Sequence, residues 1–439
     1  MSGIVFILVL LSAAFIYLVI RRVLRVYRHL STVRYPNFVY EAVGENELGI
    51  PVFTYHSIAD PNTPDSVTVE EFENHVRYLA ENGYTTIVAE DLYGYLAFRK
   101  SIPKKSVVIT FDDGRATQWT IAYPILKKYG LKAVYFIVPG LIQEAEARPN
   151  LENLWAGEDN IGEELVNADI GTQPMVSWEE VKIMHRSGVI DFQSHTMDHT
   201  LIFHDKKIED FVHPDFNFGY HGFGMPLLKN GEDDYLHSRP AWGAPIYRNR
   251  PRMYSARRFF DDENLRKACV THVEQNGGSL FFQRNAWRDE LFDLVENYRR
   301  SATLNEYYET QPEQLQAYQD NLVRSKSMIE ERLPGHSVRH LCYPWHRYSV
   351  TASSLATAAG YVSTFVDINS QKVGVDWYNP YEINRPLPTN EFGDDPNLIT
   401  RIDGRDNIAL SLPGKGRVTY QQRILSRVFQ LPSLLQRLV

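Results

Sequence analysis

The sequence has few cysteines, no excess of positive charge and no repeats, and each of these absences excludes a class of protein. Only two cysteines occur in 439 residues, Cys269 and Cys342, so the chain can form at most one disulfide and has no cysteine-rich metal motif. Acidic residues outnumber basic ones, 54 to 46, and the formal charge of −8 argues against a general nucleic-acid binder. No internal repeat or low-complexity tract indicates a solenoid or a disordered chain.

What the sequence does contain is typical of a large globular protein. Hydrophobic residues make up 44% of the chain, enough for an extensive core, and the length allows two or three average domains or one large domain with insertions. Aromatic residues reach 13%, a content that suits carbohydrate stacking as well as ordinary packing.

The N-terminus carries the longest uncharged hydrophobic run. Residues 4–20 are 17 consecutive residues without a charged side chain, at the short end of what a membrane span requires. No basic side chain precedes the run and arginines follow it in residues 21–28, which argues against a cleaved signal peptide. We therefore expect a single-pass anchor in residues 1–22 and a neck in residues 23–48, with a buried helix of a soluble protein as the alternative. The positive-inside rule places the body on the cytoplasmic side of a bacterial inner membrane, with the periplasmic side as the alternative.

Beyond the neck, short apolar strands alternate with amphipathic helices, many of which end at glycine. This alternation predicts an α/β fold with a mostly parallel sheet, either open or closed into a barrel. The predicted strands are residues 51–55, 106–111, 132–138, 189–193, 338–343 and 361–366; the predicted helices are residues 69–82, 117–129, 178–188, 315–333 and 351–359.

The alternation stops between residue 199 and about residue 314, in a stretch with clustered arginine and aromatic residues. More than a hundred residues is too long for a plain loop within a compact domain. We expect an insertion subdomain in residues 201–314, over the mouth of the sheet, and a catalytic domain made of residues 49–200 and 315–400.

One predicted strand ends in two adjacent carboxylates. Residues 106–111 are mainly apolar without helical spacing, and Asp112, Asp113 and Gly114 follow them directly. A turn at Gly114 can direct both carboxylates toward one mouth of the sheet, where one can hold a metal and the other can move a proton. In isolation these residues also suit a solvated turn, so the interpretation depends on the other strand ends.

Two histidines follow a second predicted strand. His195 and His199 are four residues apart, a spacing common in zinc proteins. A catalytic zinc needs three protein ligands and an open position for water, and two imidazoles with one aspartate meet that count. The spacing alone is weak evidence, but its place at a second strand end of the same sheet strengthens it.

A third strand end carries Pro344 and Trp345. These residues can form a pocket wall, and a backbone amide nearby can meet a developing oxyanion. The alternative is that these residues form an ordinary strand-to-helix turn capped by an aromatic residue.

With these motifs at three strand ends, the chain resembles a known family, the polysaccharide deacetylases with the NodB homology domain (carbohydrate esterase family 4). Residues 110–114 match the family's first motif, residues 194–199 match the second, and residues 343–345 are similar to the third. The likeness covers about residues 49–200 and 315–390, and it is closest to the branch that acts on poly-N-acetylglucosamine. It implies a distorted (β/α) barrel of the NodB type that carries the large insertion, in addition to the N-terminal transmembrane helix.

The resemblance also implies a division of roles. Asp112 would be the general base, and Asp113, His195 and His199 would hold a divalent metal, with Zn²⁺ as the first expectation. The metal would polarise an amide carbonyl, and hydrolysis would release acetate and leave a free amine. The residues implied to bind and orient the substrate or the base are His56, Tyr343, Trp345 and Arg385; a structural salt bridge is the alternative for Arg385.

The chain departs from the family pattern in two places. His346 replaces the glycine that normally ends the third motif, and the late Leu-x-His motif that supplies the general acid is not evident after residue 370. Protonation of the leaving amine can therefore fall to His346, His340 or His56, or to Asp112 once it has gained a proton. His346 is the candidate carried forward, and the others stay open.

Residues 401–439 form a basic C-terminal segment with an apolar helical face. No acidic residue follows Asp406, and such a segment can lie on an anionic membrane surface or pack as a terminal helix on the domain. Attachment at both ends would favour a membrane-proximal substrate.

The expected function is removal of N-acetyl groups from amino sugars of a polysaccharide or membrane-associated glycan. The alternatives are a deformylase or deacetylase of a lipid-linked sugar and, in another class, a non-catalytic glycan-binding subunit on the same fold. The expected partners are the N-acetylated glycan or lipid-linked sugar and the membrane, not nucleic acid; the oligomeric state stays open.

Overall fold

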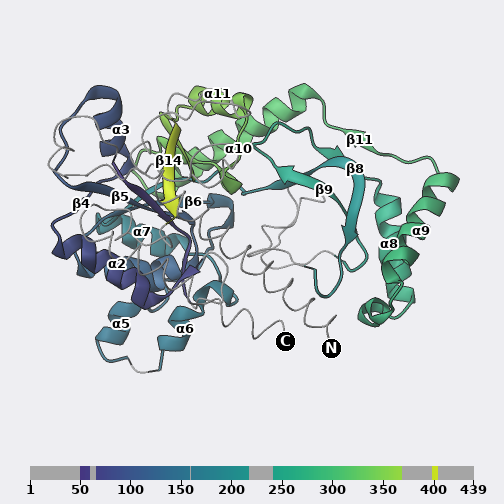
Figure 1. Ribbon diagram of the computed structural model, residues 1–439, viewed down its shortest axis with the longest axis horizontal. Coiled ribbons are helices and arrows are strands. Elements are labelled where there is room, and N and C mark those ends of the chain that lie inside the picture. The colour runs from purple at the N-terminus through teal and green to yellow at the C-terminus, as the bar shows by residue number, and fades with distance from the viewer. Residues whose placement is uncertain (1–49, 60–65, 159, 217–240, 368–397, 404–439) are drawn as a thin grey trace, which may run out of the picture.

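The structure is a computed structural model, and it describes residues 50–59, 66–158, 160–216, 241–367 and 398–403. Figure 1 shows a barrel-like sheet with surrounding helices in one part of the molecule and the insertion extending to one side of it.

Seven parallel strands are hydrogen-bonded in a closed circuit. The order runs β1, β14, β13, β12, β7, β6, β5, and β1 then pairs with β5 as well as with β14. The short strand β4 pairs in parallel with the first two residues of β5. The predicted parallel α/β architecture is therefore confirmed, with the strands curled into a barrel. The strands of this sheet are β1 (Val52–Tyr55), β4 (Thr85–Thr86), β5 (Ser106–Asp113), β6 (Ala133–Ile137), β7 (Ile190–Ser194), β12 (His340–Cys342), β13 (Ser363–Asp367) and β14 (Leu398–Asp403).

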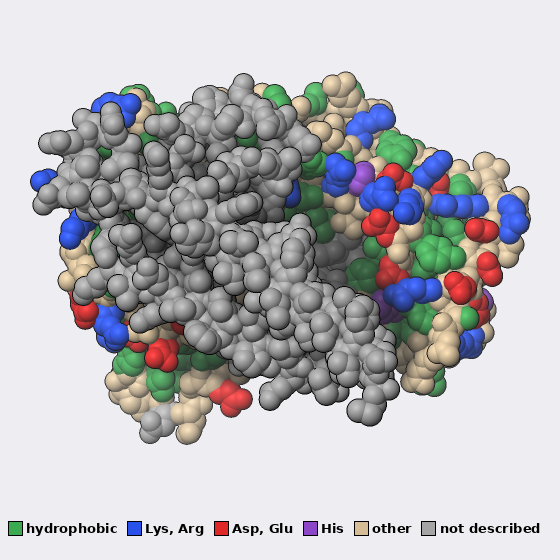
Figure 2. Space-filling view, viewed as in Figure 1, with side chains coloured by type: hydrophobic (Ala, Val, Ile, Leu, Met, Phe, Trp, Pro, Cys, Tyr) green, Lys and Arg blue, Asp and Glu red, His purple; other side chains and the backbone are tan. Residues whose placement is uncertain are grey.

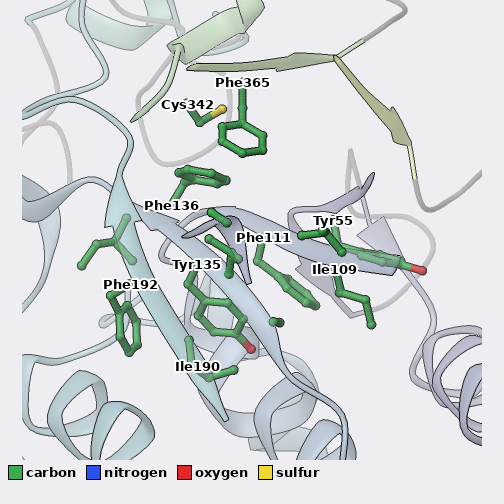
Figure 3. Packing of buried hydrophobic residues seen from close by; sticks show 14 of the residues in the cluster. Tyr55, Ile109, Phe111, Tyr135, Phe136, Ile190, Phe192, Cys342 and Phe365 are labelled. Atoms are coloured by element: carbon green, nitrogen blue, oxygen red, sulfur yellow. The ribbon is translucent and has the colours of Figure 1, made fainter. Parts of the chain in front are cut away.

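Strand β5 is buried along its whole length. All eight of its residues are buried, because β1 lies on one side of it and β6 on the other. The ring of Phe111 packs between those of Tyr55 and Tyr135, at centroid distances of 5.3 and 4.9 Å (Figure 3). This packing fixes the position of the strand that ends in both aspartates.

The helices of the barrel follow the predicted periodicity. In α2 the residues Phe72, Val76 and Leu79 are buried at helical spacing. Helix α10 begins four residues before the predicted start, because Thr310 caps it and forms a capping box with Glu313. A π-helical turn, Gln118–Ala122, precedes α4. The helices are α2 (Val69–Glu81), α3 (Ala89–Phe98), α4 (Tyr123–Lys128), α5 (Leu151–Trp155), α6 (Gly162–Val166), α7 (Trp178–Arg186), α10 (Gln311–Arg332) and α11 (Val350–Ala358).

The insertion has its own core. Tyr247, Leu265 and Leu291 belong to a hydrophobic cluster that is separate from the barrel core. An antiparallel ribbon of β8 and β9 begins two residues after His199, and a second, short ribbon joins β10 and β11. The elements are β8 (Leu201–Phe211), β9 (Pro245–Pro251), β10 (Phe259–Phe260), α8 (Glu263–Gln275), α9 (Trp287–Ser301) and β11 (Tyr307–Tyr308); a minor pair is β2 (Ser57–Ile58) and β3 (Ser66–Val67).

Several sequence predictions lie outside the described residues, namely the anchor in residues 1–22, the neck in residues 23–48 and most of the basic C-terminal segment. Among the residues that the structure does describe, no helix is both long and apolar enough to cross a membrane. One predicted boundary shifts: β14 runs to Asp403, so residues 401–403 belong to the barrel and not to the C-terminal segment.

Candidate active site

The two adjacent aspartates lie where β5 leaves the sheet. Asp113 has a φ of 75° and Gly114 a φ of 85°, so the strand's alternation of side chains is broken at this turn. A Cβ on Gly114 would approach the end of the Ile142 side chain, Cδ1, to 2.9 Å, and the φ of +85° is one that other residues rarely adopt, so the backbone conformation favours glycine here. The turn allows Asp112 and Asp113 to serve the same mouth of the barrel.

The loop with both histidines is held from two sides. The Gly140 amide donates to the Met197 carbonyl at 2.9 Å, and a Cβ on Gly140 would lie 2.4 Å from that oxygen. On the other side, the Met197 amide donates to Asn321 Oδ1 of α10 at 2.8 Å, and Asn321 Nδ2 donates to Asp198 at 2.7 Å. Close contact with the loop after β6 and with α10 therefore fixes the loop that carries the histidines.

Asp113, His195 and His199 form a set of three buried donors. Asp113 Oδ1 lies 3.6 Å from Nε2 of each histidine, and the three ligand atoms lie within 4.8 Å of one another. In a tetrahedral site with bonds of about 2.1 Å, neighbouring ligand atoms are separated by about 3.4 Å. His195 Nδ1 bonds the Cys342 carbonyl at 2.9 Å, which directs its Nε2 toward the set. The donor chemistry and the spacing fit a divalent cation such as zinc.

The electrostatic environment also suits metal ligands. Burial lowers the pKa of His199 to about 3 and also lowers that of His195, so both imidazoles are neutral near pH 7. Burial alone would raise the pKa of Asp113, but Arg115 and the histidines outweigh it and hold that pKa below its usual range. Neutral imidazole and ionised carboxylate are the protonation states in which these groups bind a metal.

Asp112 has a different partner, which the sequence did not identify. Arg401 of β14 makes two hydrogen bonds to it, from Nη1 to Oδ1 at 2.7 Å and from Nη2 to Oδ2 at 2.5 Å, and both side chains are fully buried. Burial would raise the pKa of Asp112, but Arg401 outweighs it, so the carboxylate stays ionised. The predicted orienting residue, Arg385, lies outside the described residues. No strand was predicted at residues 398–403; the signal that could have identified Arg401 is its position between Ile399 and Ile402.

The third loop places aromatic rings beside the site. Trp345 has a φ of 57°, and its ring lies 5.1 Å from that of His199. The rings of His346 and His56 lie 6.3 Å apart, and His56 Nε2 is 3.8 Å from Asp112 Oδ2. Tyr343, predicted to bind substrate, is instead fully buried and stacks on Tyr348 at 4.9 Å.

His340 lies away from these groups. It begins β12 and bonds Ser363 at 2.7 Å and Glu90 of α3 at 3.2 Å, at the end of the strand opposite to the catalytic loops. The structure therefore removes His340 from the candidate proton donors.

Backbone strain is concentrated at the site. Eight described non-glycine residues have positive φ, and five of them are in the three loops at the carboxyl ends of β5, β7 and β12. Such conformations cost about 1–3 kcal/mol each and persist only where the surroundings impose them. The five are Asp113, Thr196, His199, Trp345 and His346.

Comparison with known proteins places this geometry in context. The family model for polysaccharide deacetylase matches residues 99–211, a span that includes both aspartates and both histidines. The Bacillus subtilis (strain 168) protein YxkH, provisionally named a polysaccharide deacetylase, is 32% identical over 155 residues, which are 35% of this chain and 45% of that protein. The poly-beta-1,6-N-acetyl-D-glucosamine N-deacetylase of Staphylococcus aureus (strain MSSA476) is 32% identical over 133 residues, 30% of this chain and 38% of that protein. The chain thus spans less than half the length of these relatives.

Solved structures give a weaker likeness. A de-N-acetylase from Aggregatibacter actinomycetemcomitans aligns with a TM-score of 0.46 at 18% identity, over 83% of this chain and 99% of that chain. IcaB from Ammonifex degensii aligns with a TM-score of 0.40 at 17% identity, over 81% of this chain and 91% of that chain.

Proposed function

The chain carries a domain of the polysaccharide deacetylase family, and from this premise we propose that it is a metal-dependent hydrolase that removes N-acetyl groups from amino sugars of a glycan. The observation that carries the proposal is the division between the two aspartates. Asp113 directs one oxygen at His195 and His199, whereas Asp112 is bonded through both oxygens to Arg401.

In this proposal Asp113, His195 and His199 hold the metal. When bound, a divalent ion there would polarise the amide carbonyl and make a coordinated water easier to deprotonate. Zinc is the first candidate, because two imidazoles and one carboxylate are a common zinc ligand set.

Asp112 is the proposed general base. Its carboxylate is ionised and held in one orientation by Arg401, so it can accept the proton of the attacking water. The backbone amide of Trp345 is the proposed donor to the oxyanion that develops on the acetyl carbonyl.

Two histidines are candidates to protonate the leaving amine. His56 Nε2 lies 3.8 Å from the base, and its side chain is 20% exposed, so it can reach both Asp112 and a bound substrate. His346, the candidate from the sequence, lies beside His56, with the two ring centroids 6.3 Å apart. We therefore favour His56 as the donor and His346 as its neighbour in the same proton path.

The proposed substrate is a poly-N-acetylglucosamine chain. The support for this substrate is the similarity to the Staphylococcus aureus relative, a poly-beta-1,6-N-acetyl-D-glucosamine N-deacetylase. The test is acetate release from β-1,6-linked N-acetylglucosamine oligomers by the full chain, before and after removal of metal with a chelator. We expect release that stops on chelation and returns when zinc is added. No release from these or from other N-acetylated oligomers would refute the deacetylase proposal and favour a glycan-binding subunit.

A second candidate is deacetylation or deformylation of a lipid-linked sugar at the membrane. It is favoured by the uncharged run in residues 4–20 and the arginines that follow it. We propose an inner-membrane anchor with the body on the cytoplasmic side, and the periplasmic side as the alternative. A reporter fused to the C-terminus tests the side, because activity of a periplasm-specific reporter would contradict the cytoplasmic placement. Faster turnover of an undecaprenyl-linked sugar than of free oligomers would favour the lipid-linked substrate.

A further inference from the structure

Arg115, the residue after Gly114, contacts one of the two carboxylate oxygens of Asp113, the proposed metal ligand. Its side chain is 4% exposed, and its Nε and Nη2 both contact Asp113 Oδ2, at 2.8 and 2.7 Å. The backbone of Arg115 is fixed by a bridge to Met175. Oδ1 of Asp113 therefore remains directed at the two histidines.

The two arginines of the site treat their aspartates differently. Arg401 hydrogen-bonds both oxygens of Asp112. Arg115 contacts a single oxygen of Asp113, through a hydrogen bond from Nε and an ion-pair contact from Nη2. A carboxylate turns readily about its last torsion, so an unrestrained Asp113 would present either oxygen or both. Arg115 removes that freedom.

We propose that Arg115 is a positioning residue for Asp113: it limits this carboxylate to one donor oxygen and so sets the affinity and coordination number of the metal site. The inference rests on the metal-binding part of the proposed function. It predicts a site of three protein donor atoms with at least one position left open for water.

Removing Arg115 has two opposing consequences for the metal. Loss of orientation weakens binding, and changes of groups behind the ligands typically cost about 10–100-fold in metal affinity. Loss of the guanidinium charge, in contrast, would strengthen cation binding by reducing repulsion. If positioning dominates, as we propose, affinity falls.

A purely structural role would also destabilise the protein, so the test needs a matched pair elsewhere. Arg266 bonds Asp261 through Nε and Nη2, at 2.9 and 2.7 Å, and the Asp261 side chain is 2% exposed. This pair lies in the insertion, apart from the metal ligands, and offers an arginine–aspartate contact of similar length.

The experiment measures zinc affinity of the metal-free full chain by competition with a chromophoric chelator, and records the visible spectrum of the protein loaded with Co²⁺ alone. For Arg115→Ala we expect zinc to bind about 10–100-fold more weakly and the Co²⁺ absorption to weaken, because the second oxygen of Asp113 can then join the site as a fourth protein donor. Arg115→Gln, which keeps a neutral NH2 group as donor without the charge, should fall between wild type and Arg115→Ala. Arg266→Ala should lower the melting temperature and leave both metal readouts unchanged.

Unchanged or tighter zinc binding in Arg115→Gln, with the wild-type Co²⁺ spectrum, would overturn the inference, and this variant decides the matter where Arg115→Ala does not fold. Failure of the wild-type protein to bind zinc or cobalt at all would refute the metal site itself. Because no glycan is used, a wrong substrate assignment does not affect either result.

Discussion

The barrel and the insertion both bury arginine–carboxylate pairs, but they use them differently. In the insertion, Glu309 accepts two bonds from Arg252, at 2.7 and 2.8 Å, and a third from the Arg258 amide at 2.7 Å. Both of its oxygens are thus used to tie the end of β9 to β11. In the barrel, Asp113 keeps one oxygen for two histidines. A buried ion pair therefore indicates function only where the carboxylate also faces groups other than its arginine, as Asp113 faces the two histidines and Asp112 faces His56.

Backbone conformation separates the two regions in the same way. None of the eight described non-glycine residues with positive φ lies in the described part of the insertion, whereas five surround the candidate metal site. Over the insertion, on the right of Figure 2, lysine, arginine and acidic side chains are interspersed at the surface. At the mouth of the barrel, strained backbone conformations orient the side chains of the site. The described part of the insertion has no such strained non-glycine residue.

We expect the largest effect on stability and turnover from Arg401→Gln in the barrel. Leaving Asp112 buried without its partner should cost about 3–5 kcal/mol of unfolding free energy. Misplacement of the base should lower kcat for acetate release by about 100-fold. Urea unfolding and turnover per folded molecule measure the two. A wild-type kcat in the folded variant would mean that Arg401 only balances charge.

The corresponding change in the insertion is Glu309→Gln, which leaves Arg252 without its charge partner. We expect a similar loss of stability, about 3–5 kcal/mol, because this pair is also buried, with side chains 9% and 4% exposed. Zinc affinity and kcat of the folded fraction should stay at wild-type values. A change in zinc affinity would show that the insertion is coupled to the histidine loop through the contact of Arg252 with Thr200.

A smaller effect is expected from Gly140→Ala. The new Cβ would lie 2.4 Å from the Met197 carbonyl, so the loop between the histidines must shift. We expect about a tenfold loss of zinc affinity, as for other groups that orient ligands. Gly130→Ala is the control, because a Cβ there meets nothing within 4 Å although φ is +67°. It should cost about 1 kcal/mol of stability and leave zinc affinity unchanged; equal zinc affinity in both variants would contradict the role of the Gly140 contact.

The smallest effect should come from Arg248→Gln on the outer face of the insertion. Arg248 and Glu209 form an ion pair at 3.0 Å, with side chains 42% and 45% exposed. Exposed pairs contribute at most about 1 kcal/mol, and salt reduces that further. Thermal unfolding at low and high salt measures the contribution of this pair. A loss of several kcal/mol would show that the pair stabilises the insertion far more than exposed ion pairs usually do.

The sequence predicted those parts of the fold that depend on local patterns. Apolar spacing gave the helices and strands of the barrel, and adjacency along the chain gave both aspartates of β5 and both histidines after β7. Parallel strands then explain why these pairs meet, since their carboxyl ends share one edge of the sheet.

The parts that could not be predicted depend on contacts between distant segments. Arg401 reaches Asp112 from 289 residues away, and no local pattern encodes that pairing. Arg115 was adjacent to the motif, but its grip on a single oxygen depends on the turn at Gly114. The two-residue strands β10 and β11 are too short to produce a period. Tyr343 carries a polar group, yet it packs in the core beside Tyr348.

The central claim is that Asp113 holds the metal and Asp112 moves the proton, and one variant separates the two. Asp112→Asn keeps the shape of the side chain and removes the base. We predict zinc binding close to that of wild type and a loss of about 10²–10⁴-fold in kcat for acetate release. Acetate release at the wild-type rate, or loss of zinc from the folded variant, would contradict this division of roles.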